Sequence, residues 1–202
     1  MASQLPTNAS DQSPYIKQIQ CWLKTIIIDL NFCPFAKREY LKNSIRYAVC
    51  DTPEKEKEKD NDSSLETGLQ HLAEELQYLD QHAQTETTLL IFPHSFEEFD
   101  DFLELIELSD ELIDELGYRS IYQIAHFHPE YCFDSVEQTD ASNFTNRSPY
   151  PVLHLLRESS LQYVIEHHPD TAAIPETNIK LARQMGSAKL QALLENCKQK
   201  FK

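Results

Sequence analysis

The segment Thr87-Thr-Leu-Leu-Ile-Phe92 is a nearly continuous apolar run that ends at Pro93. A short run of this kind is typical of a β-strand that is covered on both faces of a sheet. Two other short runs rich in β-branched and aromatic residues lie before and after it, Ile45-Arg-Tyr-Ala-Val-Cys50 and Ile121-Tyr-Gln-Ile-Ala-His-Phe127. The sequence therefore predicts three strands.

Amphipathic helical patterns separate these strands. Apolar residues recur every three or four positions there, and Ser63 with Glu66 and Ser95 with Glu98 have the spacing of capping boxes. We expect five helices, at about 14–30, 63–79, 95–117, 151–167 and from Pro175 onward. Alternating strands and helices predict an α/β fold, with a small, mostly parallel three-stranded sheet and five flanking helices. A ferredoxin-like α+β fold is the competing topology.

Length and composition favour one folded core. The chain has 202 residues, of which 41% are hydrophobic. Residues 1–13 are polar and lack an apolar period, so we expect a disordered tail there. Residues 14–202 are expected to form a single α/β domain, with a charged insert at 54–62 that cannot pack.

The formal net charge of −15 repels phosphate backbones and anionic headgroups, so we expect neither nucleic acid nor a membrane as partner. Without an apolar stretch of about 20 residues or a signal peptide, the protein is expected to be cytoplasmic.

Five scattered cysteines predict free thiols. The three glycines, Gly68, Gly117 and Gly186, are too far apart to form a GxGxxG motif or a P-loop, so no dinucleotide or P-loop nucleotide is expected. The oligomeric state stays open.

Open α/β sheets bind ligands at the carboxyl ends of their strands. Here those ends carry Asp51, His94, His126 and His128. His126 and His128 are two positions apart, so on a strand both rings point to one face. With Asp140 they form a candidate site for a divalent transition metal, because imidazole and carboxylate are its usual ligands. A solvent-facing or hydrogen-bonded histidine pair is the alternative.

The densest polar stretch begins with candidate substrate-binding residues: Asn143, Thr145, Asn146, Arg147 and Ser148. Because Pro149 and Pro151 mark an expected helix start, backbone N–H groups and the Arg147 guanidinium are expected to face one anion. On that helix His154, Arg157 and Glu158 are expected to share a face, with His154 as general acid or base. Capping by Ser148 or Asn146, with Arg147 paired to a carboxylate, is the alternative.

Cys33 lies in the segment Asn31-Phe-Cys-Pro-Phe-Ala36, at the expected end of the first helix. It is a candidate nucleophile. The negative end of a helix dipole disfavours a thiolate there, and a buried packing thiol is the alternative.

Three segments carry a resemblance to a known family: Leu30-Asn-Phe-Cys-Pro-Phe-Ala36, Phe127-His-Pro-Glu-Tyr-Cys-Phe133 and Thr145-Asn-Arg-Ser-Pro-Tyr-Pro-Val-Leu-His-Leu-Leu-Arg-Glu158. They resemble the signature blocks of the bacterial and plastid family known as domain of unknown function 1415. The resemblance places the polar signature positions on Cys33, His128, Asn143, Thr145, Asn146, Arg147, Ser148, His154, Arg157 and Glu158. The family has no established activity, so the resemblance implies where a site lies and not what it does.

These patterns together predict a cytoplasmic small-molecule enzyme of the hydrolase or group-transfer class. We expect it to act on an anionic metabolite in a pocket formed by residues 126–158. His128 and His154 are expected to share proton transfer there, while Arg147 binds the anion. Two alternatives stay open: a non-catalytic binding or assembly protein that docks through the acidic helical face at 97–115 or the basic end at 198–202, and thiol chemistry at Cys33.

Overall fold

The computed structural model describes residues 13–51, 61–167 and 171–201. The expected tail at 1–13 lies outside these residues except for Ser13, and so does most of the expected charged insert. Asn61 and Asp62, which we assigned to the insert, begin a helix instead.

One four-stranded mixed sheet forms the centre of the fold, with the strand order β1-β2-β4-β3. The three predicted strands are present as β1 (Ile45–Val49), β2 (Thr87–Ile91) and β3 (Tyr122–Phe127). β1 pairs with β2 in parallel, and β4 (Val152–Arg157) lies antiparallel between β2 and β3. β1, β2 and β3 therefore run in the same direction. The prediction of three strands therefore missed one strand, β4. A ferredoxin-like fold is also excluded, because its second and third strands follow each other directly, whereas here α4 separates β2 from β3.

The fourth strand corrects the helix that we expected at 151–167. Leu153 and Leu155 point to one face of the sheet, and Val152 and His154 point to the other. The side chains of Val152, Leu153 and Leu155 are fully buried. A strand buried on both faces is apolar at successive positions, so its sequence does not alternate clearly. Only the second half of the segment is helical, as α5 (Glu158–His167).

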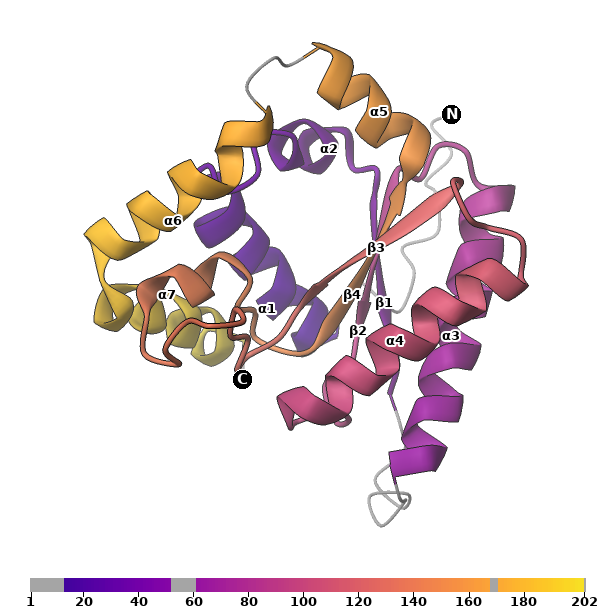
Figure 1. Ribbon diagram of the computed structural model, residues 1–202, viewed down its shortest axis with the longest axis horizontal. Coiled ribbons are helices and arrows are strands. Elements are labelled where there is room, and N and C mark those ends of the chain that lie inside the picture. Colours follow the sequence, from indigo (N-terminus) through magenta and orange to yellow (C-terminus); the bar gives the residue numbers. More distant parts are fainter. Residues whose placement is uncertain (1–12, 52–60, 168–170, 202) are drawn as a thin grey trace, which may run out of the picture.

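Helices cover both faces of the sheet (Figure 1). α3 (Asn61–Gln81) and α4 (Phe99–Glu115) lie on one side. α1 (Pro14–Trp22), its π-helical continuation η2 (Leu23–Ile28), α6 (Ile174–Met185) and α7 (Ser187–Gln199) lie on the other. The remaining helices are α2 (Ala36–Lys42) and the short 3-10 turns η4 (Ala141–Thr145) and η5 (Thr171–Ala173). The described residues thus form seven α-helices, where we expected five.

Glycine explains one of the added helices. We expected a single helix from Pro175 onward, but Gly186 has a φ of 82° and separates α6 from α7. This left-handed region is accessible to glycine at little steric cost, so the chain turns there. Gly117, with a φ of 77°, lies just beyond α4, near the end of the helix expected at about 95–117.

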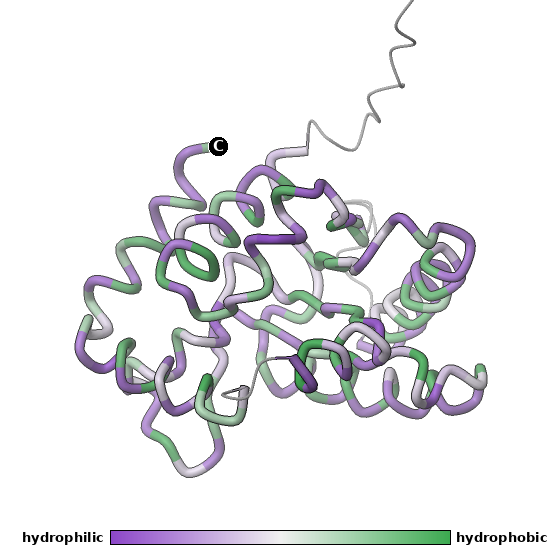
Figure 2. The backbone as a smooth tube through the Cα atoms, turned by 90° about the horizontal axis from the view of Figure 1, so that it is seen from above, coloured by the Kyte–Doolittle hydropathy of each residue, from purple (hydrophilic) through white to green (hydrophobic). Residues whose placement is uncertain are grey.

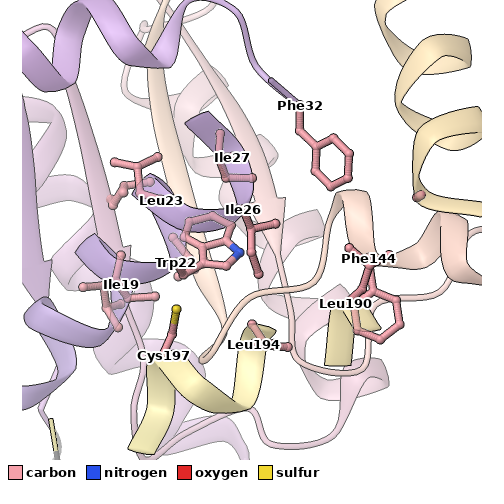
Figure 3. Close-up of a cluster of buried hydrophobic side chains, with 14 of the residues drawn as sticks. Ile19, Trp22, Leu23, Ile26, Ile27, Phe32, Phe144, Leu190, Leu194 and Cys197 are labelled. Carbon is pink, nitrogen blue, oxygen red and sulfur yellow. The ribbon is translucent and has the colours of Figure 1, made fainter. Parts of the chain in front are cut away.

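Each face of the sheet has its own apolar core. The core on the α3–α4 side is built around Leu72, Phe92 and Phe102, and the core on the α1 side around Trp22, Ile26 and Leu190. Figure 3 shows the second core, where residues of α1 and η2 meet Leu194 and Cys197 of α7. Burying each such side chain contributes about 2 kcal/mol. Along the helices of Figure 2, hydrophobic and hydrophilic stretches alternate, as amphipathic helices require.

In the described part of the chain, every helix is too short or too polar to span a lipid bilayer.

Candidate functional site

The end of the sheet where β1, β2 and β3 all terminate gathers polar side chains from distant parts of the sequence. We call this end the carboxyl edge. Asp51 follows β1, His94 follows β2 and His128 follows β3. The antiparallel β4 begins here, because Phe92 N donates a hydrogen bond to the Pro151 carbonyl over 3.0 Å.

Tyr15, Asp51 and His94 form one cluster at this edge, which we call the acid–base cluster. The Tyr15 hydroxyl lies 2.9 Å from His94 Nε2, and the two rings meet edge to face. Asp51 Oδ1 lies 3.6 Å from the same nitrogen, within ion-pair distance when the imidazole is protonated. The His94 side chain is 24% exposed and Asp51 is 64% exposed, so small solutes can reach the cluster.

A second set of contacts links a cation, Lys198, to this cluster through Tyr150. The Tyr150 ring packs edge to face on Tyr15, and its hydroxyl donates a hydrogen bond to Gln18 Oε1. Gln18 Nε2 in turn donates to the Lys198 carbonyl over 2.7 Å. Lys198 Nζ lies 5.4 Å from the Tyr150 ring centroid, which places its positive charge near Tyr150. Burial raises the pKa of Tyr150, so its hydroxyl remains a proton donor.

His128 is fully buried and uses both ring nitrogens. Nε2 lies 2.9 Å from the Phe96 carbonyl, to which it donates, and Nδ1 accepts a hydrogen bond from Glu130 N over 3.0 Å. This pairing fixes the neutral tautomer with its proton on Nε2. Burial also lowers the pKa of His128. The ring therefore has no nitrogen lone pair left for a metal or a substrate proton.

The three residues predicted to hold a metal do not form one site. His126 and His128 lie on the α3–α4 side of the sheet, where both rings pack near Phe102. Burial lowers the pKa of His126. Asp140 instead accepts hydrogen bonds from Arg183 Nε of α6 over 3.0 Å and from Ser142 N over 2.8 Å, which hold the pKa of Asp140 well below its ordinary value. Among the residues that the structure describes, no three His, Cys, Asp or Glu side chains are grouped so as to bind a metal ion.

The long loop between β3 and β4 is held together by the side chains predicted to bind an anion. Asn143 is fully buried, accepts from Phe133 N over 3.1 Å and donates to the Glu137 carbonyl over 3.0 Å. The other side chains of this group likewise bond within the loop or to the chain just after it: Thr145 Oγ1 donates to the Ser142 carbonyl, Ser148 Oγ donates to the Tyr150 carbonyl, and Asn146 Oδ1 accepts from Thr145. No helix begins at Pro149 or Pro151, so the predicted helix N-terminus for the anion is wrong.

Arg147 spans the same loop. Its Nε donates to the Tyr131 carbonyl over 3.1 Å and its Nη2 to the Gln138 carbonyl over 2.9 Å, while the guanidinium lies over the Phe144 ring. In the described chain Arg147 makes no ion pair with a carboxylate, so the predicted alternative of such a pair is also not observed. Burial lowers the pKa of Arg147. These contacts make Arg147 a fastening for the loop.

His154, Arg157 and Glu158 do not share a helical face, contrary to prediction, because the first two are on β4. His154 points to the α1 side, where its ring lies 6.2 Å from that of Phe127, so His128 and His154 lie on opposite sides of the sheet. Arg157 donates to the Leu79 carbonyl over 2.7 Å and to the Thr85 carbonyl, and Glu158 N donates to the Ile121 carbonyl. The expected transfer of protons between His128 and His154 has no geometric support.

His154 is partly exposed, unlike His128. Burial lowers the pKa of His154 from 6.5 to about 4, so its ring is neutral at pH 7. Within the described part of the chain its ring nitrogens have no hydrogen-bond partner, and the residue keeps partial exposure.

Cys33 lies in the turn after η2, where its backbone N–H donates to the Ile27 carbonyl. Burial raises the pKa of the Cys33 thiol, although backbone N–H groups of Phe35 and Ala36 oppose that shift. A thiol with a raised pKa is a poor nucleophile at neutral pH, which favours the packing role.

Sequence patterns located Asp51 and His94 at strand ends but gave no reason to join them to Tyr15, which is 79 residues from His94. Lys198 was expected only as part of a basic docking end at 198–202, and nothing in the sequence placed it near the carboxyl edge. Proximity to a strand end was the one available signal, and it applied equally to His128.

The fold and its carboxyl edge define a mixed α/β domain with a partly exposed Tyr–His–Asp cluster. The chain belongs to the family described as "Protein of unknown function (DUF1415)", whose model matches residues 14–192. This match contains the acid–base cluster and the loop between β3 and β4, whereas Lys198 lies beyond it. Comparison with curated proteins found no match, and comparison with solved structures found none.

Proposed function

We propose that this protein is a small-molecule enzyme of the hydrolase or group-transfer class that uses Tyr15 and His94 for proton transfer at the carboxyl edge. The carrying observation is the 2.9 Å contact between the Tyr15 hydroxyl and His94 Nε2 on a partly exposed histidine. Ligands of open α/β sheets bind at this edge, and histidine is the commonest acid–base group in enzymes.

The proposed proton transfer uses the three residues in sequence. With the His94 proton on Nδ1, Nε2 accepts the hydrogen bond of the Tyr15 hydroxyl. As Tyr15 takes a proton from a substrate or a water, its own proton passes to His94 Nε2. The imidazolium that forms is stabilised by Asp51, whose Oδ1 lies 3.6 Å away.

The charge near the cluster favours an anionic substrate. The chain carries a net charge of −15, so long-range attraction does not bring an anion to it. Lys198 beside Tyr150 supplies a local positive charge. In this proposal Lys198 binds the anionic group, while Arg147 and Asn143 act as positioning residues that hold the loop leading to Tyr150.

The test compares His94→Asn and Tyr15→Phe with the control His71→Asn. His71 is a matched control because its Nδ1 lies 3.7 Å from Glu74 Oε2 on the outside of α3. We would screen the full chain against chromogenic phosphate esters and carboxylic esters that carry a negative charge. Loss of a general acid–base group is expected to lower kcat by about 100-fold or more in both site variants.

Two results would contradict the proposal. One is turnover that both site variants retain. The other is a wild-type protein that turns over no ester and whose Tm is unchanged by phosphorylated and carboxylated metabolites. Lys198→Met is expected to raise KM for charged esters while changing kcat little, which separates anion binding from proton transfer.

A second candidate function is non-catalytic binding of a small molecule against His154. His154 is partly exposed, and its ring nitrogens have no hydrogen-bond partner in the described chain, so a small molecule could reach them. A bound ligand with a hydrogen-bonding group would satisfy them. In this case His154→Leu abolishes the ligand-induced rise in Tm, whereas His94→Asn leaves that rise intact.

The acidic face of α4 and the partly buried Cys33 thiol have no observation of comparable weight in their favour. The carboxylates of α4 are mostly exposed, as a solvated helix face requires.

A further inference from the structure

Two cysteines from opposite ends of the sequence lie side by side in the fold. Cys21 is on α1 and Cys197 is on α7, and their sulfur atoms are 2.8 Å apart. This is closer than two non-bonded sulfur atoms normally approach, and the two residues are 176 positions apart in the sequence. Figure 3 shows the Cys197 side chain pointing toward the α1 residues Ile19 and Trp22. The fold thus brings one thiol within reach of the other without a rearrangement of the helices.

We propose that Cys21 and Cys197 are a redox-sensitive pair that forms a disulfide between α1 and α7. This proposal is independent of the acid–base cluster. The other three thiols are placed differently: Cys50 is buried, Cys33 lies in the turn after η2, and Cys132 Sγ donates to the Val136 carbonyl over 3.2 Å.

The two thiols differ in how readily they meet an oxidant. Cys21 is partly exposed, whereas Cys197 is 1% exposed. Burial raises the pKa of Cys197 to about 12, with a further contribution from its contact with Cys21. Cys21 is therefore the thiol that reacts first, and Cys197 is the resolving thiol.

The oxidant is a low-molecular-weight disulfide such as glutathione disulfide. The Cys21 thiolate attacks one sulfur of that disulfide, which forms a mixed disulfide and releases one glutathione thiolate. Cys197 gives its proton to the released thiolate or to solvent, attacks the Cys21 sulfur and displaces the second glutathione. Two protein thiols are oxidised to one disulfide, and one glutathione disulfide is reduced to two glutathione molecules.

The bond would fix a helix pair that also supports the carboxyl edge. Gln18 lies one turn before Cys21 on α1, and it donates to the carbonyl of Lys198, the residue that follows Cys197. Gln18 also accepts the hydrogen bond of Tyr150. Closing a covalent loop across most of the chain is expected to raise Tm by about 10 °C, because long loops lose the most entropy in the unfolded state.

The test oxidises the reduced full-length protein with glutathione disulfide and maps its peptides without reduction. We expect the peptide with Cys21 to be linked to the peptide with Cys197, a fall in free thiols from five to three, and the rise in Tm. Cys132→Ser is the matched control and is expected to form the same link. Cys21→Ser and Cys197→Ala are each expected to abolish both the link and the rise in Tm.

Three results would overturn the inference: five thiols that remain free, a link that involves Cys33, Cys50 or Cys132, or a glutathione adduct on Cys21 that persists without a link. The peptide map of the wild-type protein decides among these outcomes even where a cysteine variant fails to fold.

Discussion

His94 and His128 follow strands that run to the same edge of the sheet, yet their surroundings differ in kind. His128 is fully buried and both of its ring nitrogens are bonded to the main chain. The His94 side chain is 24% exposed, and its Nε2 faces the side chains of Tyr15 and Asp51. The two are connected, because Phe96, whose carbonyl accepts from His128, belongs to the same loop as His94. His128 fixes the loop after β2 through its hydrogen bond to the Phe96 carbonyl. His94 extends from the same loop and keeps its side chain partly exposed.

The backbone conformation of Phe96 explains why other contacts must hold the loop after β2 in place. Its φ is 59°, in the left-handed region that residues with a side chain rarely adopt. Such a conformation persists only where surrounding contacts hold it. Packing of its buried ring on Phe92 and the hydrogen bond from His128 supply those contacts.

The largest expected effect comes from His128→Ala. It leaves the Phe96 carbonyl and Glu130 N without partners and opens a cavity beside Phe99 and Phe102. The free energy of unfolding is expected to fall by about 3–5 kcal/mol, measured by urea denaturation. His128→Gln, which can still donate to Phe96, is the control and is expected to lose less. If His128→Ala lowers the free energy of unfolding by less than about 1 kcal/mol, His128 does not hold the loop, and its contrast with His94 is contradicted.

A smaller effect is expected from His154, which is partly exposed, unlike the fully buried His128, and lacks hydrogen-bond partners in the described chain. Its pKa is about 4 in the folded protein and close to the ordinary 6.5 in the unfolded chain. Between these values the unfolded state binds more protons, so stability rises with pH. The contribution is fully present above pH about 6.5 and is lost as pH falls to about 4, a change of about 3 kcal/mol.

Comparison with His154→Leu isolates this contribution from the many carboxylates that titrate in the same range. The difference in unfolding free energy between wild type and variant is expected to change steadily from pH 6.5 to pH 4. His71→Asn serves as the control, because His71 is on the outside of α3 and its side chain is 38% exposed. A difference that stays constant with pH would show that His154 is not held neutral by burial.

Much of the fold followed from short-range patterns, and the main exception, the strand β4, has a physical reason. Thr87–Phe92 reads as a buried strand because apolar residues fill both of its faces and Pro93 closes it. The run from Val152 to Arg157 is similarly buried, but it follows two prolines and precedes a true helix, so its apolar positions fit a helical period as well as a strand. Only the pairing of His154 with Leu89 and Ala125 decides between the two.

The candidate site was less predictable than the fold. A polar side chain beside a strand end can bind or react with a ligand, or it can hydrogen-bond to the main chain and hold a loop in place. Asn143 and Arg147 have the residue types of a binding site, yet their donors are bonded to carbonyls of their own loop. Tyr15 has no local signal, because its meaning depends on a contact across 79 residues. Hydrogen-bond partners separate the two roles, and the sequence does not contain them.

The smallest effect on stability is expected at the acid–base cluster, where a double-mutant cycle sharpens the comparison. His94→Asn and Tyr15→Phe are each expected to lower the free energy of unfolding by about 1 kcal/mol or less, because both side chains are partly exposed and water can replace the lost partner. The coupling between them, from the single and double variants, is expected to be about 0.5–1 kcal/mol by urea denaturation. A coupling of about 3 kcal/mol, comparable with the loss at His128, would mean that Tyr15 and His94 mainly tie α1 to the loop after β2. In that case unfolding would explain the loss of turnover in these variants, and the proposed proton-transfer role would be contradicted.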